Sequence, residues 1–254
     1  MLTDAEIAAY HENGFVVPDY RLPDETVEAI RADHGRLIAR HPEFRDYCPN
    51  VLAYDLSFLN YARIPEIVDM VEQLIGPDFA LWNSSFFAKP AHNGRKTPWH
   101  QDGEYWPIRP IATCTAWIAV DDSTPENGCL RVIKGSHKQK RLFPHNTNPD
   151  RNLTLNQELR PTEYDEADAV DIVLKAGQFS LHDVFLVHGS EANTSDKPRR
   201  GMTLRFMPTT SVFDRELAVE QARAKDLLIG HEQRTLYLMR GGDRSGRNDF
   251  RMRR

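Results

Sequence analysis

Cysteines are few in this sequence, and long apolar runs are missing. Cys48, Cys114 and Cys129 are the three cysteines. They are odd in number and lack the CxxC spacing of a zinc site, so we expect buried thiols in a reducing compartment. No stretch approaches the roughly 18 apolar residues of a membrane helix, and the first residues lack the basic and apolar regions of a signal peptide. These features predict a cytoplasmic location and no membrane partner.

An excess of positive charge is missing as well. Lys and Arg total 32 against 37 Asp and Glu, which gives a net charge of −5. Such a balance offers no field that attracts nucleic acid, so no nucleic-acid partner is expected. Hydrophobic residues make up 40% and charged residues 27% of the chain, as in ordinary globular proteins. A chain of 254 residues fits a single domain.

Helical patterns occupy the first part of the chain. Thr3 and Glu6 form a capping-box pattern at the start of one helix. A second helix opens at Pro23 and has an apolar stripe that includes His34, which we expect to be packed. A third helix is predicted over 65–75, before Gly-Pro. Residues 1–78 are therefore expected to form a helical support.

Beyond residue 78 the pattern changes to short segments rich in aromatic and β-branched residues, separated by turn residues. The predicted strands are 79–89, 113–122, 129–133, 170–174, 178–187 and 201–207. Many short strands after a helical segment predict a mainly β fold with flanking helices and a jelly-roll core over 79–210.

Two further stretches complete the predicted domain, 1–254. The polar stretch 136–168 is interpreted as an insertion between strands, and such insertions often bind ligands. The segment 211–254 contains one predicted helix, 215–228, followed by a basic tail, 240–254, whose tip we expect to be disordered.

The motif Trp99-His100-Gln101-Asp102 is the first candidate for chemistry. In a strand or at its margin, residues i and i+2 point to the same face, so His100 and Asp102 can reach one ion together. With one more His they form a 2-His-1-carboxylate triad. Such a triad suits a non-haem Fe(II) oxygenase, because its open positions accept a bidentate co-substrate and O2. Alone, His-x-Asp is a weak signal.

A second motif follows the predicted strand 178–187. His188 stands at its end, and Arg199 comes eleven residues later, on the next strand. An Arg there can lie near the metal without binding it. When 2-oxoglutarate chelates iron, its C5 carboxylate points away from the metal, and a guanidinium can bind it through two parallel hydrogen bonds. The two motifs together predict Fe(II), 2-oxoglutarate and O2.

Several segments match one enzyme family in order and spacing. They are Lys89-Pro90, Thr97-Pro98-Trp99-His100-Gln101-Asp102, Trp117-Ile118-Ala119-Val120-Asp121, Glu126-Asn127-Gly128-Cys129-Leu130, Gly135-Ser136-His137-Lys138, His188-Gly189-Ser190 and Asn193-Thr194-Ser195 with Arg199-Arg200. Over roughly residues 79–207 the chain resembles the phytanoyl-CoA dioxygenase (PhyH-like) family of Fe(II)/2-oxoglutarate-dependent oxygenases. The resemblance implies a double-stranded β-helix, the cupin-like form of the jelly roll.

The resemblance also implies roles for individual residues. It assigns the iron to His100, Asp102 and His188. It assigns the co-substrate to four further residues, Arg199, Ser190, Trp117 and Ser85. Relatives that halogenate lack the carboxylate, so the intact Asp102 favours hydroxylation of an unactivated C–H bond of a small molecule, with release of succinate and CO2.

Residues beside these motifs are candidates for substrate contact. Tyr105, Trp106 and Arg109 follow the metal motif on a loop that would overhang the iron, with plain packing as the alternative. His182 either lines the pocket, is a surplus ligand or is a hydrogen-bonded strand residue. The basic residues Lys134, Lys138, Lys140 and Arg141 either meet an anionic substrate or form a solvated loop face, which is the commoner outcome.

Three alternatives remain open from the sequence. The same iron centre can desaturate, epimerise or close a ring. A jelly-roll protein that only binds or stores a metal would have no use for Arg199. A Zn(II) hydrolase built on the same three ligands would need a general base, and none is obvious.

Overall fold

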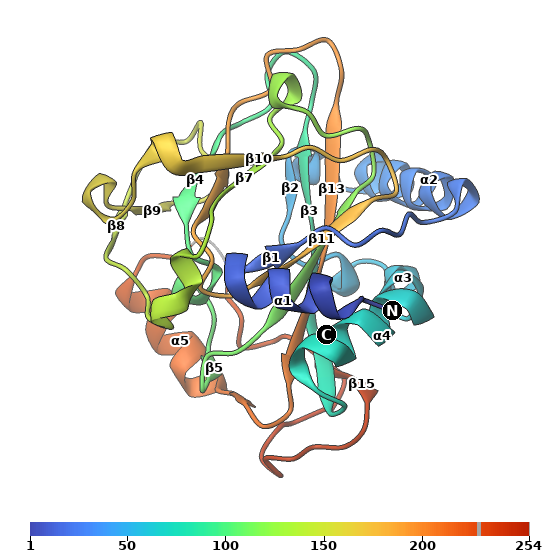
Figure 1. The fold of residues 1–254 in the computed structure, drawn as a ribbon, viewed down its shortest axis with the longest axis vertical. Coiled ribbons are helices and arrows are strands. Elements are labelled where there is room, and N and C mark those ends of the chain that lie inside the picture. Colours follow the sequence, from blue (N-terminus) through green and yellow to red (C-terminus); the bar gives the residue numbers. More distant parts are fainter. Residues whose placement is uncertain (228–229, 254) are drawn as a thin grey trace.

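Two β-sheets form the centre of the computed structural model, which describes residues 1–227 and 230–253 (Figure 1). The larger sheet has the order β1-β11-β6-β13-β3-β15, with β2 also paired to β3, and the smaller sheet has the order β10-β7-β12-β4. The larger sheet consists of Phe15–Val16 (β1), Tyr47–Cys48 (β2), Phe79–Lys89 (β3), Cys114–Ala119 (β6), Phe179–Asp183 (β11), Arg199–Pro208 (β13) and Tyr237–Arg240 (β15). The smaller consists of Thr97–His100 (β4), Leu130–Ile133 (β7), Ala169–Ile172 (β10) and His188–Ser190 (β12). The mainly β, jelly-roll prediction is confirmed.

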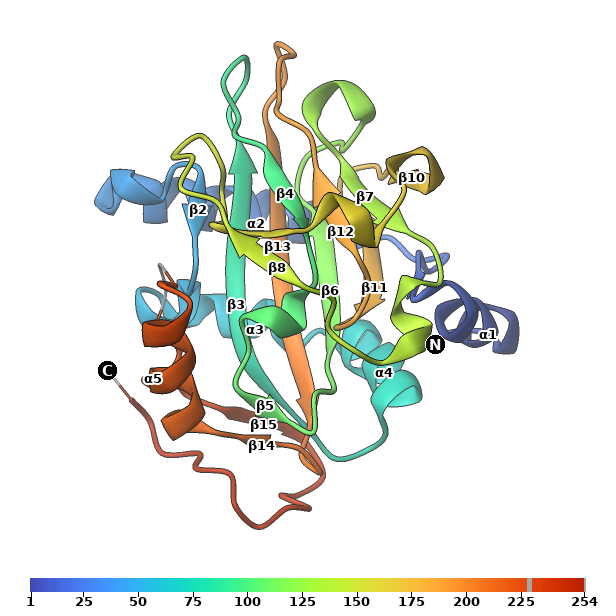
Figure 2. The same ribbon diagram turned by 90° about the vertical axis from the view of Figure 1, so that its left-hand side faces the viewer.

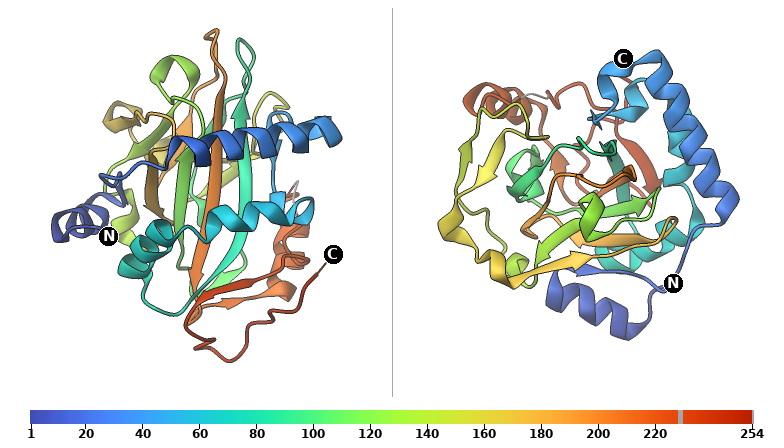
Figure 3. Two further views of the ribbon diagram at one scale, coloured as in Figure 1. Left: turned by 90° about the vertical axis from the view of Figure 1, so that its right-hand side faces the viewer. Right: turned by 90° about the horizontal axis from the view of Figure 1, so that it is seen from above.

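Helices cover the outer face of the larger sheet, as the left view of Figure 3 shows for α2 and α4. The helices are Asp4–Asn13 (α1), Asp24–Arg40 (α2), Leu59–Ala62 (α3), Pro65–Ile75 (α4) and Arg215–Ala224 (α5). The apolar stripe of α2 is buried against outward-facing residues of the sheet, and His34 packs on the ring of Phe86 at 4.4 Å between centroids, as expected. None of the described helices is long and apolar enough to cross a membrane.

The predicted strand 178–187 is too long, because only its first part is a strand and its second part is a turn. β11 ends at Asp183, whose carboxylate accepts a hydrogen bond from the Phe185 amide, and the Leu186 amide bonds back to the Asp183 carbonyl. This turn transfers the chain from the larger sheet to the smaller one. His188 therefore starts β12, directly opposite His100 on β4.

The insertion 136–168 carries its own hairpin, which consists of His145–Thr147 (β8) and Gln157–Leu159 (β9). β9 packs against β4, and in Figure 2 the insertion, drawn in yellow-green, crosses in front of the larger sheet. A further small sheet pairs Ile108–Arg109 (β5) with Val212–Phe213 (β14). The insertion thus lies beside the strand that bears the metal motif.

The C-terminal segment differs from expectation. The predicted helix 215–228 ends at Ala224, because Asp226 adopts a left-handed conformation with φ 48°; Leu228 lies outside the described residues. The basic tail is held to the rest of the chain as far as Arg253, because Arg244 pairs with Asp78 and the Arg253 amide donates to the Thr235 hydroxyl. Arg254 lies outside the described residues. The three cysteines are free and buried, as expected.

Candidate active site

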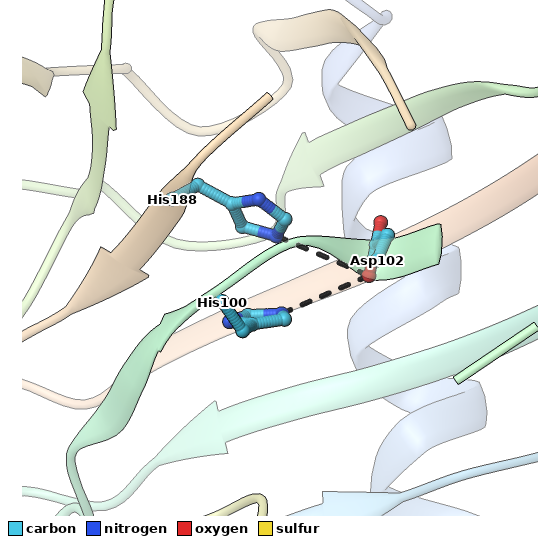
Figure 4. A group of neighbouring side chains, drawn as sticks. All are labelled: His100, Asp102 and His188. Atoms are coloured by element: carbon cyan, nitrogen blue, oxygen red, sulfur yellow. Dashed lines mark ion pairs between the residues drawn. The ribbon is translucent and has the colours of Figure 1, made fainter. Parts of the chain in front are cut away.

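Three side chains converge at the edge where β4 and β12 meet (Figure 4). His100 ends β4, His188 begins β12, and Asp102 starts the 3-10 turn Asp102–Glu104. The Nε2 atoms of His100 and His188 lie 3.7 and 4.0 Å from the Asp102 Oδ1 atom. One ligand atom from each residue lies within 4.8 Å of the other two, and all three residues are buried. The arrangement is that of a 2-His-1-carboxylate site.

Hydrogen bonds to the backbone orient both imidazoles. Nδ1 of His100 lies 2.8 Å from the Pro98 carbonyl oxygen, and Nδ1 of His188 lies 2.9 Å from that of Leu186. A carbonyl only accepts, so Nδ1 carries the proton and the Nε2 lone pair of each ring is directed at the shared site. The two rings are thereby held in the tautomer that binds a metal.

The protonation states also suit a divalent cation. Burial lowers the pKa of His188 to about 3, so its ring is neutral. Burial alone would raise the pKa of Asp102, but contacts with His100 and His182 and the charge of Arg205 hold it well below its ordinary value. The Asp102 Oδ2 atom is buried without a hydrogen-bond partner. A buried, unsatisfied carboxylate beside two imidazole Nε2 atoms fits Fe(II).

Gln101 lies between His100 and Asp102 in the sequence, and its side chain points away from the metal site. Its side-chain amide donates to the carbonyls of Phe185 and Arg141 at 2.7 and 3.2 Å, and its carbonyl accepts from the Phe143 amide at 2.7 Å. It therefore joins the metal motif to the insertion and to the turn before His188. Sequence reasoning did not single out this role.

A small cavity opens from the metal site. Besides the three metal-site residues, its lining includes Trp117, His182, Ser190, Arg199, Thr203 and Arg205. The inner face of β13 supplies much of one wall, because alternate residues of a strand share a face.

Arg199 is the predicted co-substrate residue, and it stands in this wall. Its side chain is 2% exposed, and burial lowers its pKa to about 10. Nε and Nη2 donate to the Gly128 carbonyl at 3.1 and 2.8 Å, and Nη1 donates to that of Phe87 at 3.0 Å. A guanidinium has five N–H groups, so one remains on each Nη atom. No carboxylate among the described residues forms an ion pair with it.

The indole ring of Trp117 stacks on the guanidinium of Arg199. The guanidinium carbon lies 5.3 Å from the centroid of the Trp117 ring, a cation–π distance. The indole lies over Gly201, where an added Cβ atom would be 2.2 Å from the ring. Glycine at this position therefore leaves the space that the indole occupies.

Four of the other predicted site residues line one of two hollows. Ser190 and His182 line the cavity, and the His182 Nε2 atom lies 3.8 Å from Asp102 Oδ2. Tyr105 and Trp106 line a smaller adjoining hollow.

The remaining two are not brought to either hollow. Ser85 is buried behind the wall, with its hydroxyl 2.6 Å from that of Thr203. Arg109 donates to the carbonyls of Trp106 and Ile108. None of the four basic residues of 134–141 lines the cavity; Lys138 pairs with Glu12, and Lys140 pairs with Asp183.

Arg205 is the residue that sequence reasoning missed. It is 5% exposed and lines both the main cavity and the adjoining hollow. A signal was present, because Arg199 and Arg205 are six residues apart, just before and within the predicted strand 201–207, and an even spacing along a strand puts them on the same face. Burial of that face was not visible in the sequence.

Comparisons with known proteins agree with this geometry. The sequence model described as phytanoyl-CoA dioxygenase (PhyH) matches residues 10–201. The human peroxisomal phytanoyl-CoA dioxygenase is 29% identical over 234 residues, covering 81% of this chain and 68% of that protein. A probable phytanoyl-CoA dioxygenase of Caenorhabditis elegans is 31% identical over 228 residues, covering 78% of this chain and 72% of that protein. The chain thus spans about two thirds of the length of these relatives.

Solved structures agree as well. The apo form of the non-heme monooxygenase ThoJ superposes with a TM-score of 0.75 at 25% identity, covering 98% of this chain and 87% of that one. Because the human relative is named as peroxisomal, the cytoplasmic location stays a prediction. The matched family model covers most of the chain and includes all three residues of the buried His-Asp-His cluster. This chain therefore belongs to the phytanoyl-CoA dioxygenase family of Fe(II)/2-oxoglutarate-dependent oxygenases.

Proposed function

We propose that this protein hydroxylates an unactivated C–H bond of a small molecule with Fe(II), O2 and 2-oxoglutarate, releasing succinate and CO2. His100, Asp102 and His188 hold the iron, and Arg199 binds the C5 carboxylate of 2-oxoglutarate. When bound, the iron and its co-substrate supply the O2 activation that C–H oxidation needs. The residues of the chain bind and orient the substrate and co-substrate, and they exclude water from the site.

The state of Arg199 is the observation that carries the proposal. A buried cation without an anionic partner is costly, and here its two free N–H groups stand in the wall of the cavity that holds the metal ligands. A dicarboxylate chelated at the metal would supply the missing anion, in the fork geometry that a guanidinium prefers. A metal-storage site would give Arg199 no such task.

The carboxylate of Asp102 supports hydroxylation over halogenation. Its Oδ1 atom lies 3.7 and 4.0 Å from the Nε2 atoms of the two imidazoles, which supports Asp102 as the third protein ligand. A halide would need this position to be vacant. Ser190 and Trp117 line the same cavity, and they would confine 2-oxoglutarate between Arg199 and the metal.

Binding of 2-oxoglutarate to the Fe(II)-loaded protein without O2, followed by its visible charge-transfer absorption, tests the proposal. Arg199→Met should weaken this binding by at least a hundredfold, since breaking a buried charged pair costs about 3–5 kcal/mol. Arg200→Met is the matched control, because Arg200 is the adjacent residue and pairs with Asp121 instead. The control should bind 2-oxoglutarate as the wild type does.

Turnover is measured next, as succinate formed from 2-oxoglutarate with Fe(II) and O2. Product analysis then separates hydroxylation from desaturation, epimerisation and ring closure, and metal analysis after anaerobic purification separates iron from zinc. The proposal fails if the Fe(II)-loaded protein neither binds nor consumes 2-oxoglutarate.

A further inference from the structure

Arg205 is a second buried guanidinium on the inner face of β13. Its Nη1 atom donates to the hydroxyls of Ser85 and Thr203 at 2.5 and 2.8 Å. Its Nε atom is buried without any hydrogen-bond partner, and no bond from Nη2 is formed within the described residues. The Nε–Nη2 edge, which can bind an oxyanion with two parallel hydrogen bonds, is therefore open.

The faces of this guanidinium are covered, unlike that edge. Its carbon lies 5.2 Å from the ring centroid of Trp106 and 5.8 Å from that of Phe87. Aromatic rings stabilise the charge through their faces, but they provide no acceptor for the N–H groups. Stacking and the two Nη1 hydrogen bonds therefore position Arg205 and leave the hydrogen-bonding capacity of Nε and Nη2 unused.

No carboxylate among the described residues forms an ion pair with Arg205. The nearby Arg234 adds positive charge; its Nη1 donates to the Asn83 side-chain oxygen at 2.8 Å, and its Nε donates to His231 at 3.3 Å. Burial, together with the charge of Arg205, lowers the pKa of Arg234 to about 10. Burial and both arginines hold the pKa of His231 well below its ordinary value, so it is neutral.

Co-substrate binding would not supply the missing charge. The acidic residue whose pKa Arg205 lowers is Asp102, which belongs to the metal site. In the loaded centre, the formal charges of Fe(II), Asp102, the 2-oxoglutarate dianion and Arg199 sum to zero. Arg205 would stay uncompensated beside a neutral centre, where a buried charge is costly.

The hollow next to Arg205 adjoins the metal site and has a mixed lining of aromatic rings and polar groups. The lining residues are Asp102, Arg205, Asn83 and His231 together with Tyr47, Phe87, Tyr105, Trp106 and Leu155. A ligand with an oxyanion at Arg205 would place its body against these rings, with a nearby carbon facing the iron.

We propose that Arg205 is the recognition residue for the substrate, and that the substrate is an organic anion with a carboxylate or phosphate group on an apolar body. The inference rests on the proposed oxygenase function and deepens it. Nε and Nη2 of Arg205 bind the oxyanion, and the ring-lined hollow holds the body. The oxidised carbon lies within a few bonds of the charged group, because Arg205 and Asp102 line the same two hollows.

Probe binding to the Fe(II)- and 2-oxoglutarate-loaded protein without O2 tests this inference. The probes are hexanoate, hexyl phosphate and the neutral hexan-1-ol, and binding is followed by tryptophan fluorescence, because Trp106 lines the hollow. The variants are Arg205→Met, and Arg205→Lys, which keeps the charge without the fork. Arg215→Met is the matched control, since that guanidinium also stacks on a ring, at 5.2 Å from Phe213, and lines neither hollow.

At least one anion should bind the wild type tenfold or more tighter than hexan-1-ol, and the tighter of the two anions identifies the oxyanion. Arg205→Met should remove this preference, Arg205→Lys should keep part of it, and Arg215→Met should leave it unchanged. Equal binding of all three probes to the wild type, or an unchanged preference in both Arg205 variants, overturns the inference. If Arg205→Met does not fold, the wild type and Arg205→Lys decide.

The charge-transfer absorption of the 2-oxoglutarate complex is recorded in the same samples. Its absence contradicts the proposed function. A normal absorption without any preference for anions contradicts only the role of Arg205.

Discussion

Gly201 leaves the space that the Trp117 indole fills, and occupying that space perturbs the co-substrate end of the cavity without removing a polar group. A Cβ atom at Gly201 would lie 2.2, 2.5 and 3.0 Å from Cζ2, Cε2 and Cη2 of the indole, whereas ordinary contacts begin near 3.4 Å. The ring must therefore withdraw by about 1 Å, a shift that well-packed interiors resist. Above the ring lies the guanidinium of Arg199, so withdrawal moves the indole into the cavity.

Gly201→Ala should consequently lower the free energy of unfolding by about 1–3 kcal/mol, the usual cost of overpacking. It should also weaken 2-oxoglutarate binding by tenfold or more. Urea unfolding measures the first effect, and anaerobic titration of the Fe(II)-loaded protein measures the second. The matched control is Gly35→Ala in α2, where an added Cβ atom meets nothing within 4 Å. That control should stabilise the protein by about 0.5–1 kcal/mol, because alanine favours a helix over glycine.

A double variant makes the reasoning refutable. Phenylalanine in place of Trp117 lacks the indole atoms that the added methyl group would strike, so Trp117→Phe should recover part of the stability lost in Gly201→Ala. The two changes should then be non-additive, as expected for residues in contact. Strict additivity, or 2-oxoglutarate binding by Gly201→Ala equal to that of the wild type, would refute the proposed position of the indole.

Three further changes test other parts of the structure. Gln101→Leu leaves the Phe143 amide and two carbonyls without partners. We expect the free energy of unfolding, measured in urea, to fall by about 2–4 kcal/mol and the Fe(II) affinity to weaken by roughly 10–100-fold. An unchanged Fe(II) affinity would contradict the positioning role of Gln101. Asp102→Ala should weaken Fe(II) binding still more, as measured by metal content after anaerobic dialysis, and full metal retention would argue against Asp102 as a ligand. Burial lowers the pKa of His34 to about 4, below the ordinary 6.5 of the unfolded chain. The unfolded chain therefore binds a proton at His34 more readily than the folded protein does. As a result, the contribution of His34 to the free energy of unfolding is complete above pH 6.5 and declines as the pH falls toward 4, by about 2 kcal/mol at pH 5. His34→Phe should reduce the fall in the free energy of unfolding between pH 7 and 5, as measured in urea. An unaltered pH dependence would refute the assigned role of His34.

Elements with strong local signals were predictable from the sequence. The helix 65–75 and the strand 79–89 match α4 and β3 in their bounds. Proline and glycine delimit the helix, and the strand is an aromatic-rich segment between Gly76-Pro77 and Pro90. The division of 178–187 into β11 and a turn was not predictable in the same way. Val184 to Val187 are all apolar, as in a strand, and the turn is seen only in the hydrogen bonds that the Phe185 and Leu186 amides donate to Asp183.

The candidate site was predictable as far as its motifs reach. His100, Asp102 and His188 are brought together as expected, and Arg199 lines the same cavity; their roles as ligands stay predictions. The placement of Ser85 behind the wall, and of Arg109 away from both hollows, depends on which face of each element meets the cavity. That choice is made by packing between sheets, which no local pattern records.

β13 is hydrogen-bonded on both sides, to β3 and to β6, so its register cannot slip without breaking two ladders. Arg199 and Arg205 lie six residues apart on this strand, which separates their Cα atoms by roughly 20 Å. The strand thereby fixes the distance between the two arginines, and this distance limits the combined length of 2-oxoglutarate and substrate that fits between them. Changes in the insertion can reshape the side walls while this length is kept. A relative with an altered substrate size is then expected to move or lose the second arginine and to keep the first.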